Sequence, residues 1–152
     1  MRAAAACAGV HRTELGPEPL LISDGPGLYP LRTACVWVLH AAAPIRLSFR
    51  SFFTEDNYDV LNVYDGAGEA MQLISALSGS RLPAPIVSNG TMVTLTFTAD
   101  NALRFSGFEL FASSLGANGT WPLIPAPARP TDPRTPLPAL LMSRGIGAGL
   151  SS

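Results

Sequence analysis

The alternation of apolar and polar residues is the feature of this sequence that most constrains its fold. In the stretch TMVTLTFTAD, Val93, Leu95 and Phe97 point one way and the intervening threonines point the other. The stretch IRLSFRSF, which begins at Ile45, repeats the pattern. A period of two places successive side chains on opposite faces of a strand, and a single apolar face is typical of a half-buried antiparallel strand.

Six further short segments are strand candidates, and turn residues separate them. The candidates are LLIS, CVWVLH, VLNVY, MQLIS, APIVS and GFELFAS. Turns are expected at DGPG, AAAP, DGAGE and RLPAP, and SNGT is predicted to form a two-residue Asn-Gly hairpin loop. No segment combines a helical pattern with helix caps. Seven or eight short strands with regular turns predict an all-β fold, a two-sheet antiparallel β-sandwich.

The composition of the chain changes after Trp121. The remaining residues are rich in Pro, then in Gly and Ser, and show no periodicity, which is typical of a linker or a disordered tail. We therefore expect an N-terminal stub (1–6), one sandwich domain (7–114) and a Pro- and Gly-rich linker or disordered tail (115–152). An apolar content of 47% supports a globular domain with its own core.

Charge and hydropathy argue against two classes of partner. The net charge is −1, and the ten basic residues are scattered along the chain. A surface that follows phosphates needs a clustered basic patch, so nucleic acid is not an expected partner. No apolar run reaches 18 residues, so no membrane span is predicted. The opening MRAAAACAGV is too short for the apolar core and cleavage site of a secretory signal, which leaves the compartment open.

Acidic residues are concentrated in the stretch FFTEDNYDVLNVYDG, which holds Glu55, Asp56, Asp59 and Asp65. Glu55 follows one predicted strand, Asp59 precedes the next, and Asp100 ends a third. Strand ends gather at one edge of an antiparallel sandwich, where three carboxylates would repel one another unless a cation lay between them. Ca²⁺ is bound by six to eight oxygens in flexible geometry. The pattern therefore predicts a calcium site, with solvated surface acids as the alternative.

The residues alone leave the state of the two cysteines, Cys7 and Cys35, open. In an oxidising compartment they would pair, and closing a loop of this length contributes about 3–4 kcal/mol. In a reducing one they would stay as thiols. A Cys₂His₂ zinc set with His11 and His40 is not expected. Cys35 and His40 are separated by an odd number of positions on a predicted strand, so they face opposite sides.

Taken in order, several segments resemble a CUB domain, an extracellular β-sandwich module. These segments are ISDGPGLYP, CVW, LSFRSFFTE, YDVLNVYDG, LSGSRLPAPIVSNGTMVTLTFTAD and SGFELFAS. The resemblance extends from about Cys7 to Ser114. It implies a sandwich of the jelly-roll type, a secreted or extracellular location and a non-catalytic role in protein–protein interaction. It also implies that the chain is a fragment or module of a larger protein.

The resemblance assigns roles to the cysteines and to one tryptophan. It implies a disulfide between Cys7 and Cys35, and it matches Trp37 to the core tryptophan of the family. The family usually has a second disulfide. The positions of its two cysteines are occupied here by Asp56 and Ser78, so that bridge is absent from this chain.

In the calcium-binding subset of the family, three acids and one backbone carbonyl hold the ion. The matching residues here are Glu55, Asp59, Asp100 and the carbonyl of Asn101 or Ala102. Tyr58 matches an aromatic residue beside the site, and the loop from Glu55 to Asp59 is shorter than in many members. The resemblance implies that the ion orders these loops and that the acidic rim contacts a Lys or Arg of a protein partner, as charge-assisted hydrogen bonding allows.

Two sequons mark candidate glycosylation sites in a secreted protein. They are Asn89-Gly-Thr and Asn118-Gly-Thr. SNGT already has a structural explanation as a turn, so Asn118 is the better candidate of the two.

Two alternative functions remain. The domain could be a metal-free spacer in a larger secreted protein or protease. It could also be a glycosidase that uses a carboxylate pair such as Glu55 and Asp59. No second motif supports catalysis. A Ser-His-Asp set would have to use His11, in an N-terminal stretch expected to be poorly ordered, or His40 at a strand end.

Overall fold

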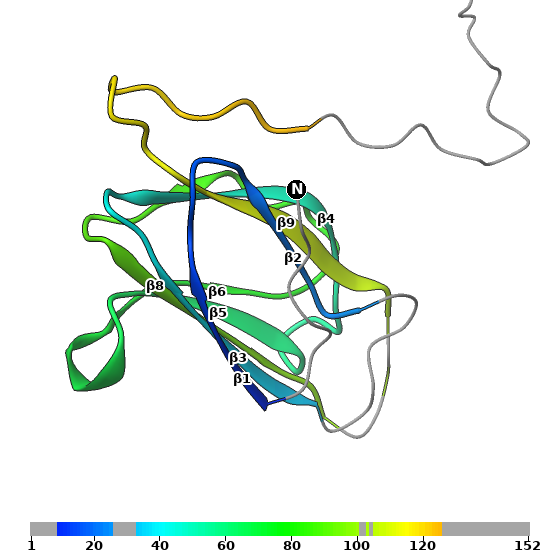
Figure 1. Cartoon of the computed structure of the whole chain (residues 1–152). Helices are drawn as coiled ribbons and strands as arrows, with labels where there is room; N and C mark the ends of the chain where they lie inside the picture. The colour runs from blue at the N-terminus through cyan, green and yellow to red at the C-terminus, as the bar shows by residue number, and fades with distance from the viewer. Residues whose placement is uncertain (1–8, 26–32, 101–102, 104, 126–152) are drawn as a thin grey trace, which may run out of the picture.

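The computed structural model describes residues 9–25, 33–100, 103 and 105–125 (Figure 1). Within these residues the chain forms β-strands and one short 3₁₀ turn (Gly68–Ala70), and no helix is long and apolar enough to cross a membrane. The strands are β1 (Gly9–Glu14), β2 (Leu20–Ser23), β3 (Ala34–His40), β4 (Ile45–Phe53), β5 (Val60–Asp65), β6 (Gln72–Leu77), β7 (Ile86–Val87), β8 (Met92–Thr98) and β9 (Gly107–Ser114).

The strands form two sheets. One has five strands in the order β1-β3-β8-β5-β6, and the other has four in the order β2-β9-β4-β7. Figure 1 shows β2, β4 and β9 in one layer and β1, β3, β5 and β8 in the other. Strand pairing is antiparallel except between β1 and β3, which run parallel. The prediction of an all-β, two-sheet sandwich is confirmed.

The apolar faces of the two sheets form one core between the layers. Val93, Leu95 and Phe97 of β8 are buried, as their alternation predicted. Trp37 of β3 is fully buried and meets Phe108 of β9 edge-on, with 5.7 Å between ring centroids. This contact joins the two sheets through large aromatic side chains, which bury the most apolar area per residue. Trp37 is therefore a core residue, as expected.

The structure corrects the expectation for His11. This residue lies within β1, in register with Trp37, and its ring stacks on the indole at 6.1 Å between centroids. The sequence of β1, GVHRTE, has only one large aliphatic residue. The segment therefore lacks the alternation that identifies the other strands, and backbone pairing with β3 holds it in place.

The predicted Asn-Gly hairpin at SNGT is wrong. β7 and β8 flank this segment but belong to different sheets, so it crosses from one layer to the other. Ser88 holds the crossing at one side, because its Oγ accepts a hydrogen bond from the backbone N–H of Ile45 at 2.9 Å. Asp65 holds the other side. Its carboxylate accepts hydrogen bonds from the N–H groups of Asn89 (2.7 Å) and Gly90 (3.3 Å).

Residues 115–122 contact the start of β4. The Leu115 N–H donates to the carbonyl of Pro44 at 2.9 Å, and the Arg46 guanidinium lies 5.0 Å from the ring centroid of Trp121. Arg46 also donates to the carbonyl of Pro122 at 3.5 Å. The boundary between domain and tail stays a prediction, since residues 1–8 and 126–152, which include the whole predicted stub and most of the predicted tail, lie outside the described residues.

Candidate functional site

Three carboxylates converge at one edge of the sandwich. Glu55 lies two residues after the end of β4, Asp59 immediately precedes β5, and Asp100 lies two residues after the end of β8. Each offers a carboxylate oxygen, and these oxygens all lie within 4.8 Å of one another. The structure thus brings together the three acids that the sequence singled out. Asn101 and Ala102, whose carbonyls were the other candidate ligands, lie outside the described residues.

A tight loop places Glu55 and Asp59 on the same side. The N–H groups of Tyr58 and Asp59 both donate to the carbonyl of Glu55, at 3.2 and 3.0 Å. Between Glu55 and Asp59 the chain reverses at Asn57, whose φ is +69°. Asn adopts this left-handed conformation more readily than most residues. The short loop is therefore able to bring the acids together.

Asp59 is the fixed member of the group. Its side chain is 0% exposed, and its Oδ1 accepts a hydrogen bond from the backbone N–H of Asp100 at 2.9 Å. This bond ties the start of β5 to the chain that follows β8. Asp59 therefore orients the third acid while keeping its own carboxylate at the site.

The electrostatics of the site favour a cation. Burial raises the pKa of the Glu55 carboxyl, and the nearby Asp100 and Asp59 carboxylates raise it further, whereas a hydrogen bond from the Leu103 backbone lowers it. Like charges this close disfavour simultaneous ionisation unless a positive charge intervenes. The available donors are carboxylate oxygens, the ligands that Ca²⁺ prefers. The three residues therefore fit a hard divalent cation.

A shallow cavity of about 360 Å³ lies beside the acids. Tyr58 borders it and is 65% exposed. On one wall Phe53 stacks on Phe105, with 4.5 Å between ring centroids. The edge thus combines negative charge with exposed aromatic surface. The complete lining is Phe53, Thr54, Glu55, Asp56, Tyr58, Gly79, Ser80, Leu103 and Phe105.

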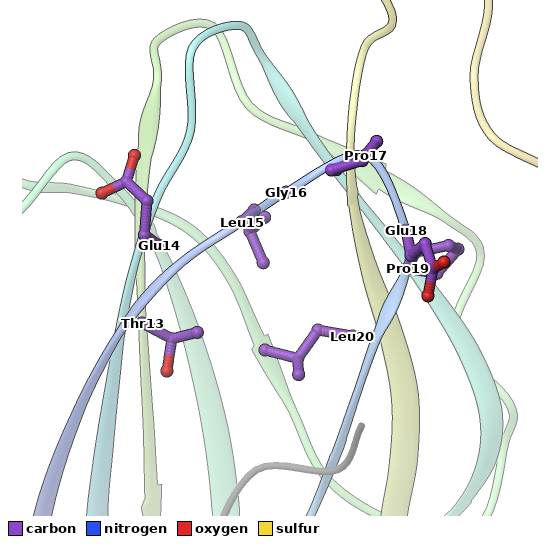
Figure 2. Close-up of a pocket in the computed structure, with 8 residues that line it drawn as sticks. All are labelled: Thr13, Glu14, Leu15, Gly16, Pro17, Glu18, Pro19 and Leu20. Atoms are coloured by element: carbon purple, nitrogen blue, oxygen red, sulfur yellow. The ribbon is translucent and has the colours of Figure 1, made fainter. Parts of the chain in front are cut away.

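A second cavity, of about 350 Å³, lies at the turn between β1 and β2 and is lined by residues 13–20 (Figure 2). Its inner side chains, Leu15 and Leu20, belong to the hydrophobic core. Glu14 points away from them and pairs with His40, 2.8 Å from its Nδ1. Polar groups do not converge here, so we assign no chemistry to this cavity.

Sequence reasoning missed a buried acid, Asp24. Its side chain is 4% exposed, and its Oδ1 accepts a hydrogen bond from the Phe108 N–H at 2.9 Å. Burial raises the pKa of Asp24 to about 6. The carboxyl also packs on Gly107 (φ +80°), where an added Cβ would lie within 2.4 Å of it. Asp24 stands in a stretch with the composition of a turn, so no sequence signal indicated its burial.

Of the predicted disulfide, the structure describes one member. Cys35 is buried and is not a free thiol. Cys7 lies outside the described residues, so the pairing stays a prediction. Of the remaining candidates, Asn89 and Asn118 are both exposed.

Comparisons with known proteins agree on the fold. Over 112 residues the chain is 35% identical to rat procollagen C-endopeptidase enhancer 1, covering 69% of this chain and 24% of that protein. It is 33% identical to human cubilin over 110 residues, covering 66% of this chain and 3% of cubilin. The chain therefore spans a small part of each of these relatives.

Among solved structures, the chain resembles the MASP-1 CUB2 domain bound to Ca²⁺. The TM-score is 0.58 and the identity 19%, over 70% of this chain and 98% of that one. At that identity the likeness shows the fold alone. Residues 17–111 match the CUB domain family, which is well over half of the chain, and this protein accordingly belongs to the CUB domain family.

Proposed function

We propose that this CUB domain is a non-catalytic, extracellular interaction module whose acidic edge binds Ca²⁺ and contacts a basic side chain of a protein partner. The observation that carries the proposal is the convergence of the Glu55, Asp59 and Asp100 carboxylates within 4.8 Å. The Ca²⁺ bound to the structurally similar MASP-1 CUB2 domain supports the choice of metal. The carbonyl of Asn101 or Ala102 is the proposed further ligand.

The ion would act through the order of the loops. It would neutralise the repulsion among the three acids and hold the segment after Asp100 against the loop from Glu55 to Asp59. Carboxylate oxygens not used by the metal would accept charge-assisted hydrogen bonds from a Lys or Arg. The exposed ring of Tyr58 would contact the aliphatic part of the same side chain.

Three observations support an extracellular setting. Cys35 is not a free thiol, which fits the proposed bridge to Cys7. Asn89 and Asn118 are exposed, as glycosylated residues must be. The chain also resembles the full extracellular region of zebrafish Gpr126/Adgrg6, with a TM-score of 0.55 and 20% identity over 71% of this chain and 14% of that one.

The geometry does not favour the carboxylate-based glycosidase. A retaining enzyme needs a carboxylate that can attack the sugar, and an inverting one needs room for a water between its two acids. Asp59 is 0% exposed and its Oδ1 is engaged by the Asp100 N–H, so it is poorly placed for either role. A structural and metal-binding role accounts for both features.

The metal assignment is tested by thermal unfolding of the full chain in EDTA and in about 5 mM Ca²⁺, a concentration above the 0.1–1 mM Kd typical of extracellular calcium modules. At ten times Kd, we expect about 1.4 kcal/mol of added stability and a rise in Tm of several degrees. Asp100→Asn and Glu55→Gln keep the side-chain shape but remove a charge, so both should abolish the shift. Asp65→Asn, at the other end of β5, is the matched control and should keep it. Equal Tm values in EDTA and Ca²⁺ would favour the metal-free spacer.

The partner chemistry is tested with a pair of small probes, N-acetyl-lysinamide and N-acetyl-norleucinamide, which differ in the terminal amine. The chain itself contains no lysine, since its ten basic residues are all arginine. In Ca²⁺ the lysine probe should shift the Tyr58 amide resonance, and the shift should vanish in EDTA. Equal shifts with both probes would mean that the edge recognises apolar surface and not a positive charge.

A further inference from the structure

We propose that Asp56 and Ser78 form a hydrogen-bonded clamp that positions the loop from Glu55 to Asp59, at the two positions where the family usually has its second disulfide. The two residues meet across the sandwich edge although 22 positions separate them. Asp56 lies between two residues of the acidic edge, and Ser78 directly follows β6. The clamp itself is independent of any metal, whereas its effect on calcium rests on the proposed function.

The Ser78 hydroxyl makes two bonds to the loop. Its Oγ–H donates to Asp56 Oδ1 at 3.1 Å, and its oxygen accepts a hydrogen bond from the backbone N–H of Asn57 at 3.0 Å. The side-chain amide of Asn57 lies 3.5 Å from Asp56 Oδ2. One hydroxyl thus fixes both the side chain of Asp56 and the backbone of the next residue.

A second pair of bonds lies directly beside the clamp. The Thr54 N–H donates to the carbonyl of Gly79 at 2.9 Å, and the Gly79 N–H donates to Thr54 Oγ1 at 3.1 Å. Gly79 has a φ of +95°, and an added Cβ would lie 3.2 Å from Asp56 Oδ1. Glycine therefore allows this turn to approach the Asp56 carboxylate closely.

The clamp acts at the residue where the loop reverses. Asn57 has a φ of +69°, and its N–H is the group that Ser78 binds. The next two N–H groups, of Tyr58 and Asp59, close the turn onto the carbonyl of Glu55. Fixing Asn57 therefore fixes the spacing of two of the three converging acids. This makes Asp56 a positioning residue, and it is not a member of the cluster.

The first experiment needs no metal. Amide hydrogen exchange of Asn57 and Gly79 is measured by NMR in EDTA for the full chain and its variants. Ser78→Ala and Asp56→Ala should speed exchange at Asn57 at least fivefold, the size of one lost hydrogen bond. Asp56→Asn keeps an acceptor oxygen and should stay within about twofold of the wild type. Ser80→Ala, in the same turn, is the control. Unchanged protection of Asn57 in Ser78→Ala would overturn the clamp.

The second experiment restores a covalent link. In the oxidised double variant Asp56→Cys/Ser78→Cys, a bridge confirmed by peptide mapping should protect the N–H of Tyr58, which closes the turn onto the carbonyl of Glu55, as well as the wild type does. Dithiothreitol should then raise its exchange to the Ser78→Ala rate, whereas wild-type chain in dithiothreitol shows what reduction does elsewhere. Failure of the two cysteines to bridge, or fast exchange in the bridged form, would contradict the replacement of a disulfide.

Calcium affinity separates this inference from the proposed function. If the wild type binds Ca²⁺, Ser78→Ala should raise the Kd about fivefold, while Ser80→Ala and the bridged double variant should leave it unchanged. A wild type that binds no Ca²⁺ removes the proposed function, and the exchange data then decide the clamp alone. A Ser78→Ala variant with fast exchange and wild-type affinity would show a clamp that does not position the ligands.

Discussion

The two ends of strand β5 carry aspartates in opposite situations. Asp65, at one end, accepts two backbone N–H groups from the crossing that contains Asn89 and Gly90. Asp59, at the other end, accepts the N–H of Asp100, and its carboxylate lies within 4.8 Å of those of two more acids. Both aspartates belong to the motif YDVLNVYDG and look alike in the sequence. Their surroundings give them different chemistry.

The difference shows how a fold assigns roles to carboxylates. An acid that binds backbone N–H groups has its charge compensated locally, and it serves as a structural link. Asp24 makes the same kind of link, since it takes the Phe108 N–H in a buried position, but burial outweighs this hydrogen bond and raises its pKa to about 6. Acids that face one another raise each other's pKa, as happens to Glu55, and their arrangement favours a metal. The difference between acids that bind backbone N–H groups and acids that face one another can be tested by substitution, beginning with the largest expected effect.

The largest effect is expected from Gly107→Ala. The new Cβ would collide with the Asp24 carboxyl and would strain a backbone at φ +80°. We expect a loss of about 3 kcal/mol in the free energy of unfolding, measured by denaturant titration. In an Asp24→Ala background the collision is removed, so the same substitution should cost less. Simple additivity of the two changes would show that Asp24 does not occupy this space.

The second-largest effect is expected from the titration of Asp24, which should make the stability of the domain depend on pH. The pKa of Asp24 is raised to about 6 in the folded state, above the value of 3.8 expected when unfolded. The folded state therefore binds the Asp24 proton more tightly than the unfolded state does. The free energy of unfolding should increase as the pH falls from 7 through 6 to 4, by on the order of 2 kcal/mol. The raised pKa of Glu55 acts in the same direction in EDTA. The quantity to measure is therefore the difference in the free energy of unfolding between the wild type and Asp24→Asn as a function of pH. Parallel pH profiles for the wild type and this variant would refute a raised pKa at Asp24.

Asp65→Ala should have a smaller effect, since the two hydrogen bonds that it removes lie partly in solvent. We expect about 1.5 kcal/mol of destabilisation and faster amide exchange at Asn89 and Gly90. The Ca²⁺-dependent rise in Tm should be the same as in the wild type. Loss of that rise would mean that the two ends of β5 are coupled and that Asp65 also contributes to the acidic edge.

The smallest effect is expected from Glu14→Gln. The Glu14 carboxylate lies 2.8 Å from His40 Nδ1, within hydrogen-bond distance, but the two side chains are 69% and 49% exposed. Pairs in this setting contribute roughly 0–1 kcal/mol, so a change of less than about 0.5 kcal/mol is expected. A larger loss would show that exposed carboxylates also contribute to the stability of this fold.

Local patterns predicted most of the strands well, because the alternation of apolar and polar residues is itself local. The burial of Val93, Leu95 and Phe97 follows from period two alone. β1 was missed because its pairing with β3, and not its own composition, makes it a strand. The SNGT segment was misassigned because Asn-Gly favours a turn whichever strands flank it.

The candidate site was partly predictable for a different reason. The positions of Glu55, Asp59 and Asp100 at predicted strand ends, together with the CUB resemblance, were enough to propose that they meet. Nothing local indicates that Ser78 approaches Asp56, since this contact depends on how the turn after β6 packs on the loop. The resemblance marked the two positions as the site of an absent bridge, and the hydrogen bonds appear only in three dimensions.

The contacts of residues 115–122 with the start of β4 attach this segment, called here the tether, to one end of the sandwich. The acidic edge lies at the other end of β4. Arg46, Trp121 and Pro122 meet near the first residues of the strand, and Glu55 lies two residues beyond its last residue. Nine residues of extended chain separate these points, a distance of about 25–30 Å. A pulling force on the chain after Trp121 would therefore act on the domain at the start of β4, far from the acidic edge. A partner could dock at that edge without competing with the tether for surface.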